Sequence, residues 1–269
     1  MFDVLPLNAH NPGPMTGRGN NTYLIVSDGA AALIDAGVGD PQHLADITDA
    51  LHARNAELQQ VLVTHGHTDH ASGAPALATH HPRASFLKCP WPEQDSRFAV
   101  EWRPLVDGDA VTIGDERVLV LHTPGHSPDH LAFWHEPSAT VFAGDLVVAG
   151  SSVMIHASRG GNLTQYLASL ERLLSLKPAA LLPAHGLPPK YPSALLSSYL
   201  EHRAAREKQV VDALANGRTT VEAISEFIYD RLDPALMAAA RENVRAHLDK
   251  LEAEGRVDRD EAGRWRLRG

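Results

Sequence analysis

The stretch VLVTHGHTDH, residues 61–70, places three histidines and an aspartate directly after an apolar run. Side chains alternate in an extended segment, so His65 and His67 are expected to project from the same face of the chain. The chain then turns into a predicted helix, which puts Asp69 and His70 at its start, near the same point in space. Two adjacent sets of donors with different geometry suit two metal ions better than one.

Three later junctions between a strand and a loop supply further donors. TPGHSPDH holds His126, FAGD ends in Asp145, and LPAHG holds His185, each next to a glycine. Glycine allows the backbone to approach a metal closely or to adopt a positive φ. Imidazole and carboxylate fit Zn²⁺, and also Mn²⁺ or Fe²⁺, while the single cysteine, Cys89, cannot form a thiolate cluster. We therefore expect two divalent metal ions, with zinc favoured.

Short apolar strands separated by turn residues dominate the first two thirds of the chain. Strands this short, with few helices between them, indicate a β-sandwich or mixed sheet rather than a doubly wound parallel sheet. Two β-rich halves flanked by helices predict an α+β fold with α/β/β/α layers. The predicted strands are 22–26, 31–37, 60–66, 84–89, 110–114, 117–125, 131–135, 140–145 and 179–186. The predicted helices are 40–54, 71–81 and 162–176.

The segment LPPKYP, residues 187–192, marks a change in composition. Beyond it the chain is almost all helix and closes with RVDRDEAGRWRLRG, which predicts two short strands around a turn. Three helices followed by a hairpin resemble a small winged-helix module. We therefore predict a large domain over 1–196 and a winged-helix-like domain over 197–269. The predicted helices of the second domain are 197–216, 220–230 and 234–254.

Together, the H-x-H-x-D-H motif and the later His, Asp and His in that order resemble the metallo-β-lactamase superfamily, an agreement far stronger than one short motif. The resemblance implies a four-layer αβ/βα sandwich whose metal ligands lie at one end. It implies that the first metal is held by His65, His67 and His126. It implies that the second is held by Asp69, His70 and His185, with Asp145 bridging both.

The resemblance extends to one branch, the β-lactamase-like protein 2 family, through NPGPMTGRGNNTYLI (11–25), LIDAG (33–37), PGHSPDH (124–130) and the helical tail. Its members combine the sandwich with a winged-helix-like end. Its animal members are regarded as single-strand-specific endoribonucleases, fungal relatives act as thioesterases, and bacterial members are often labelled hydroxyacylglutathione hydrolases. Enzymes that open β-lactams usually have cysteine or serine at the position of Asp145, so true β-lactamase activity is not expected.

The predicted centre implies a hydrolase in which a hydroxide bridging two ions attacks a carbonyl or a phosphorus. Asp69 is the nearest carboxylate and a candidate catalytic residue that orients the nucleophile or relays its proton. His130 is a second candidate, as a donor to the oxyanion of the substrate; the alternative is a hydrogen-bonded loop histidine. Asp35 either orients a ligand imidazole or caps a turn.

Charge bears on the substrate. The 269-residue chain has a formal net charge of −9, and residues 201–269 hold 13 Lys and Arg against 14 Asp and Glu. Such a chain has little means of steering polyanions, so we expect a small ester or thioester substrate, as in hydroxyacylglutathione hydrolases or acyl-thioesterases. The alternative is a metal-dependent endoribonuclease on single-stranded RNA, favoured by the family resemblance and the arginines of 256–268. If the tail does not bind nucleic acid, it shapes the cleft or a homodimer.

The beginning of the chain, MFDVLPLNAH, has no basic region followed by an apolar core. No stretch approaches the ~20 apolar residues that a membrane span needs. We therefore expect a cytoplasmic protein without a membrane partner.

Overall fold

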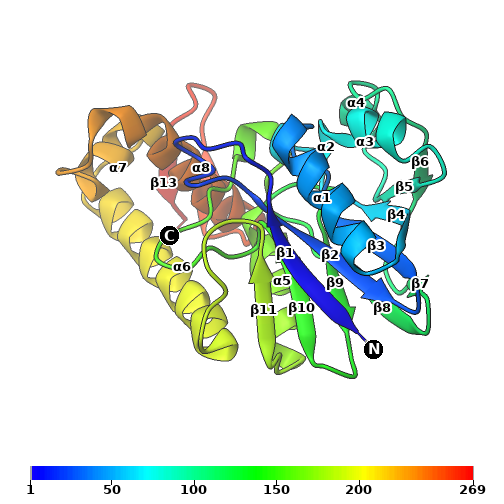
Figure 1. Ribbon diagram of the computed structural model, residues 1–269. Coiled ribbons are helices and arrows are strands. Elements are labelled where there is room, and N and C mark those ends of the chain that lie inside the picture. The colour runs from blue at the N-terminus through cyan, green and yellow to red at the C-terminus, as the bar shows by residue number, and fades with distance from the viewer. Residues whose placement is uncertain (1, 269) are drawn as a thin grey trace.

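The computed structural model describes residues 2–268 and consists of two packed β-sheets with helices on both outer sides (Figure 1). The first sheet has six strands in the order β1-β2-β3-β4-β5-β6. The pairs from β1 to β3 are antiparallel, and those from β3 to β6 are parallel. The strands are β1 (Asp3–Asn8), β2 (Asn21–Ser27), β3 (Ala30–Ile34), β4 (Glu57–Leu62), β5 (Ser85–Lys88) and β6 (Trp102–Pro104).

The second sheet has five strands in the order β11-β10-β9-β8-β7. Its pairs are antiparallel except for β10 and β11, which are parallel. The strands are β7 (Ala110–Ile113), β8 (Glu116–His122), β9 (Leu131–His135), β10 (Thr140–Gly144) and β11 (Ala180–Pro183).

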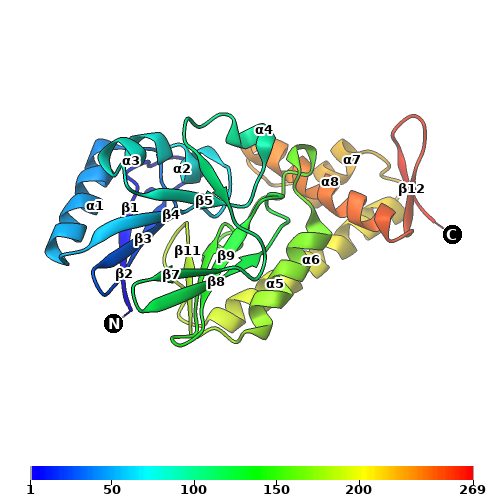
Figure 2. The same cartoon turned by 90° about the vertical axis from the view of Figure 1, so that its right-hand side faces the viewer.

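Alternation along the strands divides each sheet between two cores. In β2, Leu24 and Val26 pack with the outer helices, whereas Tyr23 and Ile25 pack against the second sheet, with Phe133 among their neighbours. The outer face of the second sheet forms a third core with the helix that covers it. The four-layer αβ/βα sandwich is therefore confirmed (Figure 2).

The helices begin where the sequence provides capping groups. The Asp40 side chain accepts a hydrogen bond from the Gln42 amide, and Pro41 occupies the first helical turn. Asn162 caps the helix over the second sheet in the same way, through the Gln165 amide. The helices of this region are α1 (Pro41–Ala53), α2 (Thr68–Ala71), α3 (Ala74–His80), α4 (Pro92–Asp95), the 3-10 turn η1 (Ala157–Arg159) and α5 (Leu163–Ser175).

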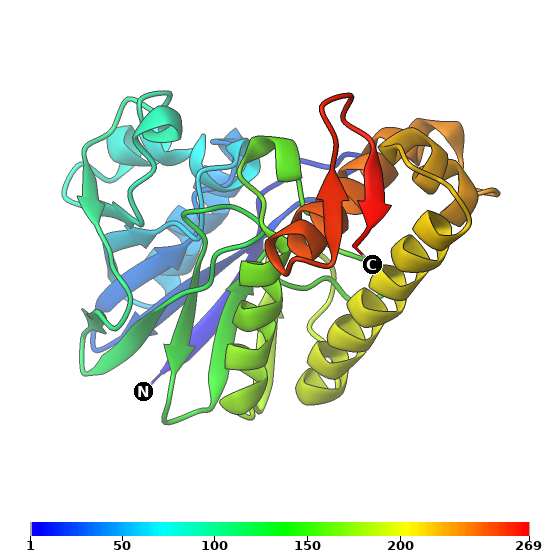
Figure 3. The same ribbon diagram turned by 180° about the vertical axis from the view of Figure 1, so that it is seen from behind.

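The C-terminal unit has a core of its own, in which Val210, Ile224, Val244 and Trp265 are buried. It also packs on the sandwich, because α8 contacts both α5 and η1 (Figure 3). The elements are α6 (Pro192–Ala215), α7 (Val221–Ile228), η2 (Pro234–Leu236), α8 (Met237–Ala253), β12 (Val257–Arg259) and β13 (Trp265–Leu267). Three helices and a two-stranded wing agree with the predicted winged helix.

The helix predicted over 71–81 was wrong in its bounds. It consists of α2, which begins earlier at Thr68, and α3, which begins at Ala74. Between them, a Cβ at Gly73 would lie 2.1 Å from the Ala36 carbonyl oxygen. The chain therefore presses against the end of β3 at this point, and that contact places Asp69 and His70 within a separate short helix.

The start of the long helix α6 also differs from the prediction. It begins at Pro192 and not at 197, because proline fits the first turn of a helix, where no amide donor is needed. The predicted boundary between 196 and 197 thus falls inside a continuous helix, and the division into two domains at that point stays a prediction. Within residues 2–268, no helix is long and apolar enough to cross a membrane.

Candidate metal centre

The seven predicted ligands come from loops that follow strands of both sheets. The loop after β4 and the short α2 carry His65, His67, Asp69 and His70. The second sheet supplies the rest from the loop between β8 and β9 and from the ends of β10 and β11: His126, Asp145 and His185. The structure brings all seven together in two groups, with Asp145 in the first.

Three ring nitrogens converge in the first group. His65 Nε2 lies 2.8 Å from His67 Nδ1, and His126 Nε2 lies 3.0 Å from the same Nδ1 atom. One ligand atom from each of these three histidines and from Asp145 lies within 4.8 Å of the others. That is the arrangement a divalent ion requires from neutral imidazoles.

The second group surrounds the other side of Asp145. His70 Nε2 and His185 Nε2 lie 3.4 and 3.5 Å from Asp69 Oδ2. Asp145 Oδ1 is 3.2 Å from His185 Nε2, whereas Asp145 Oδ2 is 3.4 Å from His126 Nε2. One carboxylate thus directs one oxygen at each group, as a residue bridging two ions would.

The outward nitrogens of three of these histidines are held by neighbouring oxygens. His65 Nδ1 is 3.0 Å from the Thr64 hydroxyl, and His126 Nδ1 donates to the Met154 carbonyl at 3.2 Å. His70 Nδ1 donates to Asp35 Oδ2 at 2.8 Å. Contacts of this kind fix the tautomer and ring orientation of metal-binding histidines. Of the two interpretations of Asp35, orientation of a ligand imidazole agrees with this geometry.

The donor set fits divalent metal ions. It consists of imidazole nitrogens and carboxylate oxygens, which suit Zn²⁺, Mn²⁺ and Fe²⁺. Although His185 Nε2 lies 3.2 Å away, buried Asp145 Oδ1 forms no hydrogen bond of ordinary geometry with any described residue, whereas buried polar oxygens are normally satisfied. A positive ion between the two groups would satisfy it.

The electrostatics of the two groups differ. Burial holds the pKa of His65 well below its usual value and lowers the pKa of His67 to about 3. Burial also opposes charge on His70, but Asp69, Asp145 and Asp35 outweigh it and hold the pKa of His70 well above its usual value. The histidines of the first group are therefore neutral, the form that binds metal, whereas a metal in the second group would displace a proton from His70.

Asp69 is the carboxylate of the centre that faces solvent. Its side chain is 27% exposed, against 12% for Asp145. Asn20 donates to Asp69 Oδ2 at 3.0 Å and to the Asp69 carbonyl at 3.1 Å, which fixes the carboxylate from the residue directly before β2. Asn20 was not singled out from the sequence, because its partner lies 49 residues away.

His130, predicted as a catalytic candidate, is fully buried. Its Nε2 accepts a hydrogen bond from the Asp145 amide at 3.0 Å, and its Nδ1 lies 2.9 Å from the Thr123 hydroxyl. With Nε2 as acceptor, Nδ1 carries the proton and donates to Thr123. Both nitrogens are therefore used inside the protein, and the geometry agrees with the alternative of a hydrogen-bonded histidine that holds the backbone of Asp145.

A buried ion-pair network supports the first group, and sequence reasoning missed it. Lys88 is 1% exposed and lies 2.5 Å from Asp95 Oδ1 and 3.1 Å from Asp129 Oδ2. Asp129 in turn accepts a hydrogen bond from the Gly66 amide at 2.8 Å and another from the Ser127 hydroxyl at 2.9 Å. One carboxylate thus joins the loop between His65 and His67 to the loop of His126. The only sequence signal was a lysine directly after the apolar pair Phe86 and Leu87 in β5.

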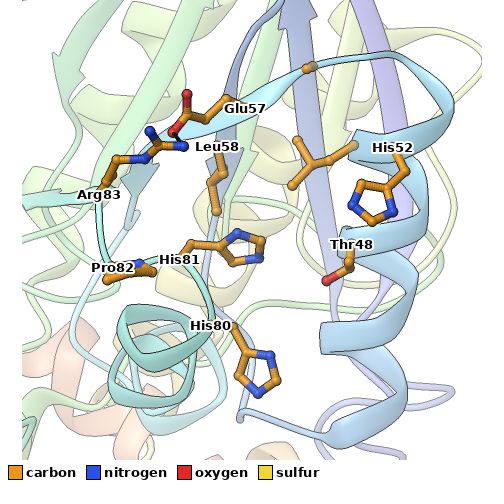
Figure 4. Close-up of a pocket in the computed structure, with 10 residues that line it drawn as sticks. Thr48, His52, Glu57, Leu58, His80, His81, Pro82 and Arg83 are labelled. Carbon is orange, nitrogen blue, oxygen red and sulfur yellow. Dashed lines mark ion pairs between the residues drawn. The ribbon is translucent and has the colours of Figure 1, made fainter.

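A cavity of about 270 Å³ lies elsewhere, where α1 and α3 end beside the start of β4 (Figure 4). Its walls include His52, His80 and His81, and an ion pair joins Arg83 to Glu57 at 2.5 Å. None of its lining residues belongs to the two donor groups. The donor geometry, and not this cavity, therefore locates the centre.

Comparison with known proteins agrees with this architecture. Residues 15–185 match the metallo-beta-lactamase superfamily, and residues 220–265 match the beta-lactamase associated winged helix domain. The beta-lactamase-like protein 2 homolog of Drosophila melanogaster is 31% identical over 266 residues, which cover 94% of this chain and 89% of that protein.

Two solved structures show the same sandwich. A beta-lactamase domain protein from Burkholderia ambifaria superposes with a TM-score of 0.82 at 24% identity, covering 99% of this chain and 91% of that one. TTHA1623 in a di-iron-bound form superposes with a TM-score of 0.57 at 29% identity, covering 74% of this chain and 97% of that one. By these matches and by its own donor geometry, the chain belongs to the metallo-beta-lactamase superfamily of metal-dependent hydrolases.

Proposed function

We propose that this protein holds two divalent metal ions and hydrolyses a small ester or thioester. One observation carries the proposal: Asp145 lies between two groups of donors and directs one oxygen at each. His65, His67 and His126 would hold the first ion. Asp69, His70 and His185 would hold the second, with Asp145 shared. Zinc fits the donors best, and the di-iron form of TTHA1623 makes iron the main alternative.

Bound divalent ions supply Lewis acidity and lower the pKa of a coordinated water towards neutrality. The protein's own task is to position the groups around that water. Asp69 would orient the attacking water and accept its proton, because its carboxylate is held by Asn20 and remains accessible to solvent. His130 would act indirectly, because it accepts a hydrogen bond from the backbone amide of Asp145 and so fixes the position of that residue.

The preference for a small substrate rests on the surface of the C-terminal unit. Arg256 pairs with Glu207 at 2.5 Å and with Glu254 at 3.3 Å, and Arg268 pairs with Asp258 at 2.9 Å. These partners neutralise part of the only arginine-rich element of the tail. A surface that binds nucleic acid usually keeps a broad basic face free for phosphates.

In the winged-helix unit, the helix that corresponds to a recognition helix packs against the protein itself. In helix-turn-helix modules the second helix enters the major groove with its N-terminal residues at the bases. Here that helix is α8, and its N-terminal half faces the sandwich: Glu242 accepts from the Ser158 amide at 2.9 Å. The predicted alternative, an endoribonuclease, would need another surface for its RNA.

A substrate panel tests the proposal. Metal-loaded protein is assayed with an acylglutathione thioester, a nitrophenyl ester and a single-stranded RNA, before and after removal of metal by a chelator. We expect metal-dependent hydrolysis of the thioester or the ester and none of the RNA. Metal-dependent cleavage of RNA alone would replace the proposal with the endoribonuclease alternative.

A further inference from the structure

Arg203 of α6 is a buried cation without a carboxylate partner. Its side chain is 2% exposed, and within residues 2–268 it forms no ion pair, although buried arginines are almost always paired with an acid. Keeping a guanidinium in the interior without a counter-ion is costly. Its hydrogen bonds are therefore expected to have a role that an apolar leucine or methionine at this position could not fill.

The contacts of Arg203 reach the loop that follows Asp145. One guanidinium nitrogen, Nη2, donates to the Val153 carbonyl, and Nη1 donates to Asn243 Oδ1 of α8 at 3.2 Å. The same Asn243 oxygen accepts from the Ile155 amide at 3.4 Å. Arg203 and Asn243 thus hold the backbone on both sides of Met154.

Met154 is the residue whose carbonyl accepts the hydrogen bond from His126 Nδ1, at 3.2 Å. That nitrogen lies on the ring opposite the Nε2 atom of the first donor group. A shift of the Met154 carbonyl would therefore rotate or release the His126 ring. Glu242 fastens the same loop further along, through the Ser158 amide, so two consecutive residues of α8 act on it.

A second route leads from Arg203 to the centre through Tyr166 of α5. The guanidinium lies over the Tyr166 ring, 5.3 Å from its centroid, and the Tyr166 hydroxyl donates to the Leu146 carbonyl at 2.7 Å. The backbone of Tyr166 also lies under Gly125, where a Cβ would come within 2.2 Å of the Tyr166 amide nitrogen. Leu146 and Gly125 are the chain neighbours of Asp145 and His126.

We infer that Arg203 is a positioning residue of the metal centre, through which the C-terminal helices set the first metal site. Together with Asn243 it fixes the Met154 carbonyl and hence the ring of His126. This inference rests on the proposed function, because it takes His126 to be a ligand. It assigns the C-terminal unit a task inside the enzyme, independent of any nucleic acid.

Titration with Zn²⁺ against a chromophoric chelator tests the inference. The variants are Arg203→Met, Arg203→Lys, Asn243→Ala and, as a control, Glu252→Ala, which is exposed and lies nine residues beyond Asn243, on the opposite side of α8. We expect Arg203→Met and Asn243→Ala to lower the zinc affinity of one of the two sites by about 10-fold to 100-fold, as loss of an outer contact to a ligand does. Arg203→Lys should recover part of the loss, and Glu252→Ala should match the wild type.

The affected site is identified in a His126→Ala background. In that background the first site is already lost, so Arg203→Met should not lower the zinc affinity of the remaining site further. Hydrogen exchange of residues 153–161 in metal-free protein gives a second readout, which should speed up in Asn243→Ala and not in Glu252→Ala. If Arg203→Met does not fold, Asn243→Ala decides the question alone.

Three results would overturn the inference. The first is a folded Arg203→Met or Asn243→Ala protein that binds both zinc ions with wild-type affinity. The second is an equal loss of zinc affinity at both sites, which would indicate a general loss of structure. The third is a wild-type protein that takes up no zinc, which would overturn the proposed function as well. In that case, faster hydrogen exchange of residues 153–161 in Asn243→Ala would still show that Asn243 holds this loop.

Discussion

At the scale of single residues, Asp145 connects the two halves of the centre, because each of its oxygens faces a different donor group. Replacing it by alanine should remove a ligand of both ions. We expect Asp145→Ala to lose most of one metal per chain and at least about 100-fold in hydrolysis, more than the loss of an outer contact alone. Metal analysis and thioester hydrolysis check this.

The control for Asp145→Ala is His80→Ala. His80 lines the separate cavity between α1 and α3 and belongs to neither donor group. Its loss should leave metal content and activity at wild-type levels. Equal behaviour of the two variants would show that the ligand assignment is wrong.

Lys88 makes a prediction about stability. It is 1% exposed, and its removal would leave the buried carboxylate of Asp129 and the partly buried carboxylate of Asp95 without a cation. Breaking one side of a buried pair costs about 3–5 kcal/mol, so Lys88→Met should lower the free energy of unfolding by that amount. Urea denaturation measures it.

A matched pair on the surface isolates the effect of burial. Arg83 lies as close to Glu57, 2.5 Å, as Lys88 does to Asp95, but its side chain is 81% exposed. Arg83→Met should therefore change the free energy of unfolding by less than about 1 kcal/mol. Similar losses in Lys88→Met and Arg83→Met would contradict a structural role for the buried network.

The residues that the sequence identified share a local signal. His65, His67 and His70 stand in one short motif, and His126 and His185 each adjoin a glycine at a strand end. Residues that act through a distant partner gave no such signal: Asn20, Lys88, Asp129 and Arg203 owe their roles to contacts with other loops. The tertiary fold creates those contacts, so one sequence alone could not reveal them.

At the scale of elements, the hairpin of β12 and β13 bears on the choice of substrate. Replacing Arg264, Arg266 and Arg268 by glutamine should leave the hydrolysis of a small thioester within about twofold of the wild type, because its attack takes place at the metal centre. If RNA were the substrate, its affinity would fall by about 0.7 log units per log unit of salt for each contacted phosphate. Salt-sensitive RNA cleavage that the triple variant weakens would contradict the small-substrate proposal.

Elements with a clear hydrophobic period were predicted well, whereas the two edge strands of the first sheet were not. The stripe of α5 and the short apolar strands of the second sheet follow from the sequence alone. Strands β1 and β6 lie at the two edges of the first sheet and were missed. An edge strand pairs on one side only and is partly exposed, so its sequence lacks a full apolar pattern.

At the scale of the whole molecule, the metal ions would join the two sheets. Four of the seven donors follow strands of the first sheet, and three follow strands of the second. Metal binding should therefore stabilise the complete sandwich. With free metal at a thousand times its dissociation constant, one site contributes about 4 kcal/mol, which corresponds to roughly 10 °C in Tm for a chain of this size. Calorimetry with and without chelator checks this; an unchanged Tm would contradict a metal shared between the sheets.

The packing of α8 against α6 predicts a pH dependence of stability. His247 of α8 is 1% exposed, and neither of its ring nitrogens has a hydrogen-bond partner among the described residues. Burial, reinforced by Arg203 and Lys250, lowers the pKa of His247 from 6.5 to about 3. The folded protein therefore keeps this ring neutral at pH values where the unfolded chain protonates it.

The sign of the effect follows from this difference. Between pH 6.5 and about 3 the unfolded state binds one more proton than the folded state at His247, so stability falls as the pH is lowered through that range. The slope from this residue approaches about 1.4 kcal/mol per pH unit. His247→Phe keeps a ring of similar size and cannot take up the proton, so its unfolding free energy should fall less steeply between pH 6 and about 4.5 by up to that amount. Urea denaturation of both proteins in the presence of chelator removes the contribution of the metal sites, and parallel pH curves would show that His247 is protonated equally in the folded and unfolded states.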